Sequence, residues 1–171
     1  MSDHLTLSSS QVDKCGELLV QYQLLRHGLE SAALTTDPSI DLVAYSGVEK
    51  RPFAIQVKTN LRPTPAGLKG MALDWWLPEG GAAELVVLVE LQHERIWALT
   101  QEELAAVAQR ASGGRLHVFV YTDLHAHPLS PSTNPSFDRF LLTERIPALF
   151  GAVRVSASVA KRRSFPQITS R

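Results

Sequence analysis

The sequence has little cysteine and no excess of either charge. Cys15 is the single cysteine among 171 residues, which excludes an internal disulfide framework and fits a reducing compartment. Lys and Arg total 17, as do Asp and Glu, so the net charge is zero. The chain as a whole therefore lacks the general attraction for nucleic acid that a strongly basic protein has. Basic residues cluster only locally, at residues 161–163.

Long apolar runs are also absent. No segment approaches the roughly 18 apolar residues of a membrane-spanning helix, and the N-terminus has no apolar core of a signal peptide. We therefore expect a cytoplasmic protein that does not contact the membrane. Hydrophobic residues make up 44% of the chain and charged residues 20%, which suits one domain with a substantial core. We predict one α/β domain over residues 1–155 and a basic C-terminal tail over residues 156–171.

Helices and strands are expected to alternate along the chain. The serines at residues 8–10 are predicted to cap a helix from about residue 11 to residue 27, with Gly28 as its C-terminal stop. The predicted buried stripe of this helix consists of Val12, Cys15, Leu19 and Tyr22. Residues 84–91 form a continuous apolar run, which is typical of a central strand covered on both faces.

The other predicted elements are shorter. A capping box at residues 100–103 predicts a helix that ends near residue 111, and residues 61–78 are predicted to be rich in loops because they contain three prolines and two glycines. Further strands are predicted at residues 31–34, 95–99 and 116–121, and a last helix or helix pair at residues 137–150, broken near Pro147. This order favours a central mixed β-sheet flanked by helices.

The most informative pattern is a predicted β-hairpin. Its two apolar segments, residues 40–45 and 53–58, flank a polar segment that contains glycine and proline. If residues 48 and 49 lie near the tip, Asp41 stands opposite Gln56. The alternation of side chains along a strand then places Gln56 and Lys58 on a common face.

A carboxylate, an amide oxygen and an ammonium group would converge at this position. Oxygen ligands hold a hard cation such as Mg²⁺, and a lysine can orient an attacking water, so the set suits metal-assisted hydrolysis of a phosphodiester. In a purely structural alternative, Asp41 is an exposed residue at a strand start, Gln56 lies on a solvated face and Lys58 is an ordinary edge lysine.

These segments resemble the PD-(D/E)XK nuclease superfamily, which has the restriction-endonuclease-like fold. The resemblance rests on residues 14–20, 40–43 and 55–59, in the order helix, Asp, hairpin and Gln-x-Lys, and it covers roughly residues 10 to 100. The Gln-x-Lys form occurs in some branches, including Mrr-like proteins and certain homing endonucleases. Two features depart from the commoner pattern. Gln56 replaces an acidic residue, and the Pro-Asp pair is present only loosely, within residues 37–41.

The resemblance implies a restriction-endonuclease-like α/β core, with a central mixed β-sheet flanked by helices. It further implies an endonuclease that depends on Mg²⁺ or Mn²⁺ and hydrolyses DNA, with RNA as the alternative substrate. Asp41, Gln56, Glu17 and the backbone carbonyl of Val57 would be the metal ligands, and Lys58 would orient the attacking water. Glu17 also belongs to a polar stripe of the first helix, with Asp13 and Gln21, which a plain solvated surface explains equally well.

Two other functions are consistent with the same residues. A neutral Gln56 weakens a metal site, so the chain would then be a catalytically inactive nuclease-fold protein that binds nucleic acid. Alternatively, it serves as a subunit of a larger complex. Because the chain is small and has no separate DNA-reading domain, we expect a homodimer under any of these interpretations. The pair Trp75 and Trp76 is interpreted as a hydrophobic lid over the sheet, with base stacking as the alternative.

Overall fold

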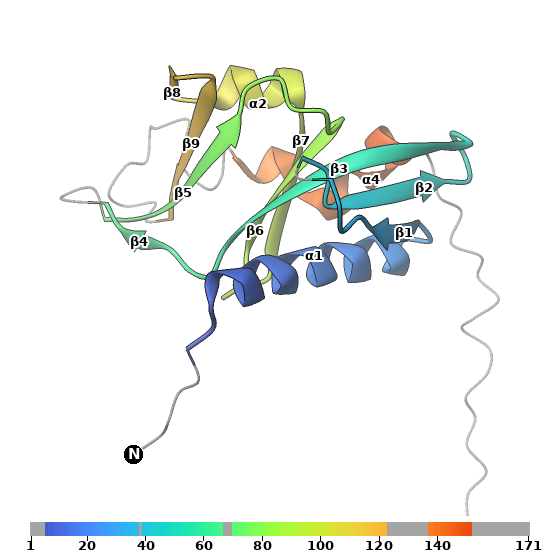
Figure 1. The fold of residues 1–171 in the computed structure, drawn as a ribbon, viewed down its shortest axis with the longest axis horizontal. Coiled ribbons are helices and arrows are strands. Elements are labelled where there is room, and N and C mark those ends of the chain that lie inside the picture. Colours follow the sequence, from blue (N-terminus) through green and yellow to red (C-terminus); the bar gives the residue numbers. More distant parts are fainter. Residues whose placement is uncertain (1–5, 38, 67–69, 123–136, 152–171) are drawn as a thin grey trace, which may run out of the picture.

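The computed structural model describes residues 6–37, 39–66, 70–122 and 137–151 (Figure 1). The predicted basic tail, residues 156–171, lies outside these residues. The helical elements are α1 (Ser9–Arg26), α2 (Gln101–Val107), the 3-10 helix η2 (Asp138–Phe140) and α4 (Leu142–Phe150). The strands are β1 (Glu30–Ala33), β2 (Leu42–Ser46), β3 (Arg51–Asn60), β4 (Thr64–Pro65), β5 (Met71–Pro78), β6 (Leu85–Glu90), β7 (Arg95–Thr100), β8 (Arg110–Ser112) and β9 (Arg115–Tyr121). In the described part of the chain, no helix has both the length and the apolar character needed to cross a membrane.

The strands form two sheets. The first sheet has the order β1-β2-β3-β6-β7, and it is mixed because β3 and β6 are parallel while the other neighbours are antiparallel. This confirms the predicted central mixed sheet. The second sheet has the order β4-β5-β9-β8 and is entirely antiparallel. It was not predicted from the sequence.

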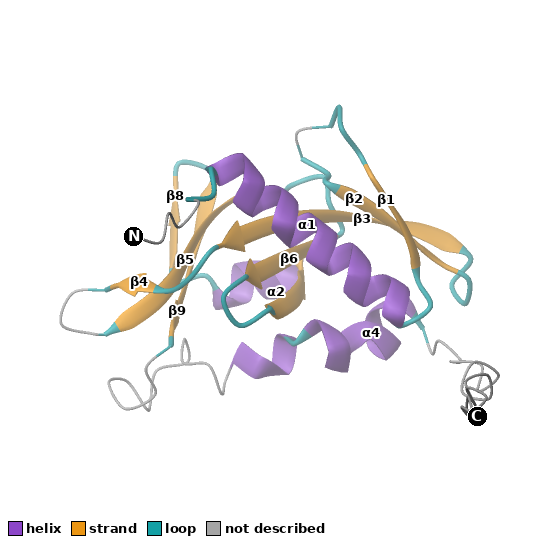
Figure 2. Cartoon of the chain, turned by 90° about the horizontal axis from the view of Figure 1, so that it is seen from below, coloured by secondary structure: helices purple, strands orange, loops and turns teal. Residues whose placement is uncertain are grey.

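The two faces of the first sheet have separate hydrophobic cores. Helices α1 and α4 lie on one face (Figure 2), where apolar residues of β2, β3, β6 and β7 are buried. The second sheet, α2 and η2 cover the opposite face. Every residue of β6 is buried, with Leu85, Val87 and Val89 in the first core and Val86 and Leu88 in the second. The predicted strand covered on both faces is therefore confirmed.

Helix α1 begins as predicted but buries a different stripe. The Ser8 side chain accepts the Gln11 N–H and the Gln11 side chain accepts the Ser8 N–H, which completes a capping box. The buried residues are Gly16, Val20 and Leu24, whereas Cys15 and Tyr22 of the predicted stripe are exposed. The helix packs very closely on β3 at Gly16, where an added Cβ would lie 1.9 Å from the Thr59 Oγ1.

Three predicted boundaries were wrong. Residues 61–78 contain β4 and β5, whose prolines stand at or beyond the strand ends. The helix expected to reach residue 111 ends at Val107, because residues 110–112 pair with β9. The last helical segment breaks at Leu141, which forms a β-bridge with Trp97, and Pro147 lies inside α4.

Candidate metal centre

The register of the β2–β3 hairpin places Asp41 opposite Gln56. Leu42 pairs with Ile55, so the preceding residue, Asp41, faces Gln56 across the two strands. The Asp41 N–H donates to the Ile55 carbonyl at 2.9 Å, which extends the ladder beyond the end of β2. The turn occupies residues 47–50. The predicted register and tip are confirmed.

The carboxylate of Asp41 is attached directly to β3. Its Oδ2 accepts the Val57 N–H at 2.6 Å, so the side chain replaces the main-chain acceptor that a longer β2 would supply. The other carboxylate oxygen has no hydrogen-bond partner among the residues that the structure describes. One oxygen of Asp41 therefore holds the hairpin in register, and the second is available to a ligand.

Gln56 is almost completely buried, with 4% of its surface exposed. Within the described residues its side-chain amide makes no hydrogen bond. The amide oxygen and nitrogen are not among the fully buried, unpaired polar atoms of the described residues, so they remain accessible to water or to a ligand. By alternation, Gln56 and Lys58 lie on the face opposite Ile55 and Val57, which point into the core under α1. Lys58 is half-buried.

Four charged groups influence one another around Asp41. Burial is the largest influence on the pKa of Asp41 and raises it above its usual 3.8, whereas the Val57 N–H and the positive charge of Lys58 lower it. The negative charges of Glu17 and Asp13 raise the pKa of Asp41 further. The acids of α1 therefore act on the same carboxylate as Lys58 does. A cation at this position would relieve the repulsion among the three acids.

The close packing of α1 on β3 at Gly16 positions Glu17, the next residue. Glu17 forms an ion pair with Lys14 at 2.7 Å. Asp13 was named in the sequence only as part of the polar stripe, and its effect on Asp41 was not foreseen. The sequence did contain a signal for this effect, because Asp13 stands one helical turn before Glu17 and therefore on the same side of α1. The polar-stripe residue Gln21 instead donates to the Ser31 carbonyl at 3.5 Å, which places it at the contact between α1 and β1.

The tryptophan pair, Trp75 and Trp76, is divided between the two faces of the second sheet. Trp75 is buried in the second core against Trp97, as expected for a lid over the sheet. Trp76 lies on the outer face of the second sheet, where its ring stacks on His117 at 4.3 Å between centroids.

His125 and His127, whose spacing occurs in some metal sites, lie outside the described residues. In the ranges that are described, no group of three or more His, Cys, Asp or Glu side chains is arranged to hold a metal. A cation site here therefore depends on neutral oxygen ligands as well.

Comparison with solved structures identifies the fold. The bacterial homing endonuclease I-Ssp6803I superposes with a TM-score of 0.56 at 17% sequence identity, covering 86% of this chain and 96% of the endonuclease. Hjc, a Holliday junction resolvase of Archaeoglobus fulgidus, gives a TM-score of 0.43 at 18% identity, covering 68% of this chain and 88% of the resolvase. No family model and no curated protein sequence matches the chain. The chain has the restriction-endonuclease-like fold that its sequence predicted.

Proposed function

We propose that this chain is a metal-dependent nuclease that hydrolyses phosphodiester bonds in DNA. One observation carries the proposal. One oxygen of the Asp41 carboxylate has no partner among the described residues, and Asp41 stands opposite Gln56, whose amide makes no hydrogen bond with them. Gln56 and Lys58 lie on the same strand, β3. The fold that holds these residues is the one found in a bacterial homing endonuclease.

The donor set fits a divalent cation with oxygen ligands. Asp41 and the side-chain oxygen of Gln56 would hold Mg²⁺ or Mn²⁺, with Glu17 and the backbone carbonyl of Val57 completing the set. The raised pKa of Asp41 is a condition that a bound cation would relieve. When bound, the metal would polarise the scissile phosphate and lower the pKa of a coordinated water.

Lys58 is the residue to which we assign the orientation of the attacking water. Lys58 shares a face of β3 with Gln56, and its positive charge lowers the pKa of the Asp41 carboxyl. A fixed positive charge there would also stabilise the negative charge that develops on the phosphate.

The experiment that tests this proposal is DNA cleavage in Mg²⁺ or Mn²⁺, with a chelator as the negative condition and an RNA strand as the alternative substrate. We expect Asp41→Ala and Lys58→Ala each to lower the cleavage rate by at least about a hundredfold, the usual effect of losing one electrostatic group from such a site. Asp74→Ala serves as the control, because Asp74 pairs with His117 on the second sheet. Cleavage that persists in excess chelator would refute the mechanism.

A second candidate function is a catalytically inactive nuclease-fold protein that binds nucleic acid or serves as a subunit of a larger complex. The observation that favours it is the small number of proposed carboxylate ligands, since only Asp41 and Glu17 are acidic and Gln56 is neutral. DNA binding that weakens with salt, without cleavage, would support the nucleic-acid binder. A lack of DNA binding would leave the subunit role.

We also propose that two copies of the chain associate in the cytoplasm through α1. Its outer face exposes Leu18, Tyr22 and Leu25, with 55%, 56% and 60% of their surfaces accessible. Their spacing of four and then three residues is that of a helix that packs along another helix. A two-fold symmetric contact would bury the same stripe on both copies.

A further inference from the structure

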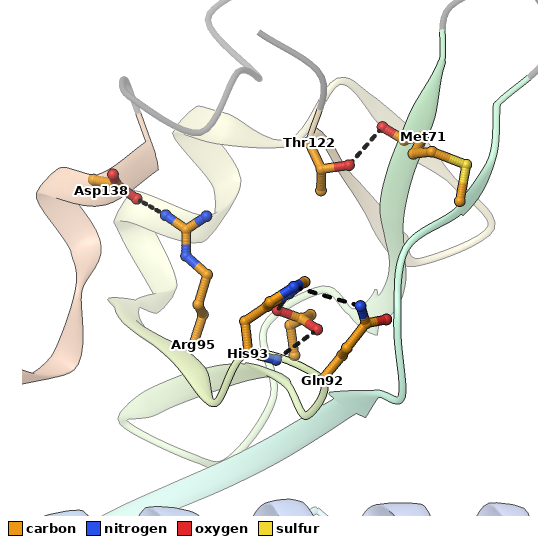
Figure 3. Close-up of polar contacts among 7 residues, drawn as sticks. Met71, Gln92, His93, Arg95, Thr122 and Asp138 are labelled. Atoms are coloured by element: carbon orange, nitrogen blue, oxygen red, sulfur yellow. Dashed lines mark hydrogen bonds and ion pairs between the residues drawn. The ribbon is translucent and has the colours of Figure 1, made fainter.

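A cavity of about 550 Å³ lies between the second sheet and the turn that joins β6 to β7. Its volume is within the range of small-molecule sites. Figure 3 shows Gln92 and His93 on one side of this region and Met71 and Thr122 on the other. The described residues that line it are Arg62, Pro63, Thr64, Pro65, Met71, Gln92, His93 and Thr122. None of these carries a carboxylate, so the lining combines hydrogen-bonding groups, apolar surface and positive charge.

A buried carboxylate orients the histidine of this cavity. The Glu90 side chain is only 2% exposed, and its Oε2 lies 3.0 Å from the His93 Nδ1. Its Oε1 accepts the His93 backbone N–H at 3.1 Å. Both oxygens of Glu90 are therefore used to fix one residue, whose own ring remains 59% exposed. The remaining ring nitrogen, Nε2, hydrogen-bonds with the Gln92 amide nitrogen at 3.4 Å, so Gln92 and His93 together form one polar wall of the cavity.

Arg62 supplies a positive charge that no other described residue neutralises. Its guanidinium makes no hydrogen bond or ion pair with any part of the chain that the structure describes. The neighbouring Arg95 differs, because Asp138 pairs with it at 2.6 Å (Figure 3). An arginine with no partner among the described residues, in a lining that contains no carboxylate, is the arrangement expected for an anion such as a phosphate group.

The main chain connects this cavity to the candidate metal centre. Strand β3 carries Gln56 and Lys58, continues to Asn60 and leads directly to Arg62. The Leu91 N–H donates to the Asn60 carbonyl at 3.0 Å, and the Gln92 N–H donates to the Leu61 carbonyl at 3.0 Å. These bonds attach the end of β3 to the turn that bears His93. A strand of nucleic acid at Lys58 would thus find the next positive charge along the chain at Arg62, two residues beyond the end of β3.

We infer that this cavity is a second contact for the bound nucleic acid, taking one nucleotide with its phosphate at Arg62 and a polar group of the nucleotide beside Gln92 and His93. The apolar surface of Pro63, Pro65 and Met71 would contact the sugar or base. The inference rests on the proposed nuclease function, because it assumes that a nucleic-acid strand passes the metal centre. It adds a binding residue, Arg62, that lies outside the proposed catalytic set.

The test measures binding of a fluorescent DNA duplex, and of the corresponding single strand, in chelator and at a series of salt concentrations. We expect Arg62→Ala to weaken binding roughly tenfold at moderate salt and to reduce the salt slope by about 0.9 for duplex or 0.7 for single strand, the effect of one phosphate contact. His93→Gln should weaken binding less. Arg110→Ala removes an exposed arginine of β8, outside the cavity, and is the matched control.

A second arm locates the phosphate. Neutral methylphosphonate linkages are placed one at a time along the DNA, and each DNA is bound to the wild type and to Arg62→Ala. We expect one linkage position to weaken the wild type and to have no further effect on Arg62→Ala, as for two partners of one contact. Additive effects at every position, or equal losses for Arg62→Ala and Arg110→Ala, would overturn the inference.

Cleavage in Mg²⁺ is measured separately, so the two proposals can fail independently. DNA binding that depends on Arg62 without any cleavage would support the cavity and refute the nuclease. Cleavage with an unchanged salt slope for Arg62→Ala would refute the cavity alone. A wild-type chain that does not bind DNA would refute both.

Discussion

Asp41 makes a hydrogen bond that holds β2 and β3 together, but the surroundings of its carboxylate disfavour the negative charge. The Val57 N–H bond holds it against β3, whereas burial and the acids of α1 raise its pKa. The folded chain therefore binds a proton at Asp41 more tightly than the unfolded chain does. It follows that the contribution of Asp41 to the free energy of unfolding falls as the pH rises from 3.8 through the raised pKa.

We expect Asp41→Asn to remove this pH-dependent loss. The asparagine side chain can still accept the Val57 N–H, so the metal-free variant should be as stable as the wild type near neutral pH, or more stable by less than about 1 kcal/mol for a half-exposed group. Urea unfolding of both proteins across the acidic and neutral range measures the difference. Added Mn²⁺ should stabilise the wild type only. A clear loss of stability in Asp41→Asn at neutral pH would contradict this account.

Gln56 allows the metal proposal to be tested without a nuclease assay. If its amide oxygen is a ligand, Gln56→Glu should keep or strengthen Mn²⁺ binding, because it introduces a charged oxygen at the same position. Gln56→Leu should abolish binding. Calorimetric titration of Mn²⁺ into the three proteins is the measurement. Identical isotherms for the wild type and Gln56→Leu would remove Gln56 from the site and favour the catalytically inactive nuclease-fold protein.

At the scale of elements, α1 and β3 make a very close contact at Gly16, which has no side chain. An alanine at residue 16 would place its Cβ 1.9 Å from the Thr59 Oγ1, and the neighbouring atoms are no farther than 2.9 Å. We expect Gly16→Ala to lower the free energy of unfolding by about 1–3 kcal/mol, as overpacking of a core does. Gly47→Ala is the control, because nothing lies within 4 Å of a Cβ there. Urea unfolding compares the two, and equal stabilities would show that α1 shifts freely.

This same contact explains why the buried stripe of α1 was predicted wrongly. Apolar residues occur on both sides of the helix, so their periodicity does not identify the inner face. The closest contact with the sheet is made by Gly16, which has no side chain and contributes no hydrophobic signal. Thr59 lies on the core face of β3, with its hydroxyl buried against Gly16, because it is one residue away from Lys58 and therefore points to the opposite face.

The hairpin and β6 were predicted correctly because their signals are local. The turn between the strands that lead to Asp41 and Gln56 is short, contains Gly47 and is closely followed by Pro52, so the register follows from counting residues from the tip. The second sheet has no local signal of that kind. Strand β5 pairs with β9 through contacts such as Trp75 with Val118, across a long stretch of chain that includes β6, β7 and α2. Neither partner indicates the other in the sequence.

At the scale of the whole molecule, the exposed stripe of α1 predicts self-association. We expect the mass measured by light scattering to rise with concentration from one chain toward two. Leu18→Glu or Leu25→Glu should keep the protein monomeric, because a charge would then lie in the apolar contact. Leu34→Glu, at another exposed leucine, is the control. A wild-type chain that stays monomeric at every concentration would contradict the proposed homodimer.

Because the Asp41 side chain is bonded to Val57, the two ends of the β2–β3 hairpin differ in how well they tolerate a change in the number of residues. Residues added to the turn at 47–50 would lengthen only the tip and leave the pairing of the strands unchanged. A single deletion between residues 53 and 56 would exchange the two faces of β3 downstream of it, so that Lys58 entered the core under α1. Insertions and deletions are therefore tolerable at the tip and damaging near Gln56. Among related chains, the tip should vary in length while the spacing from Gln56 to Lys58 stays constant.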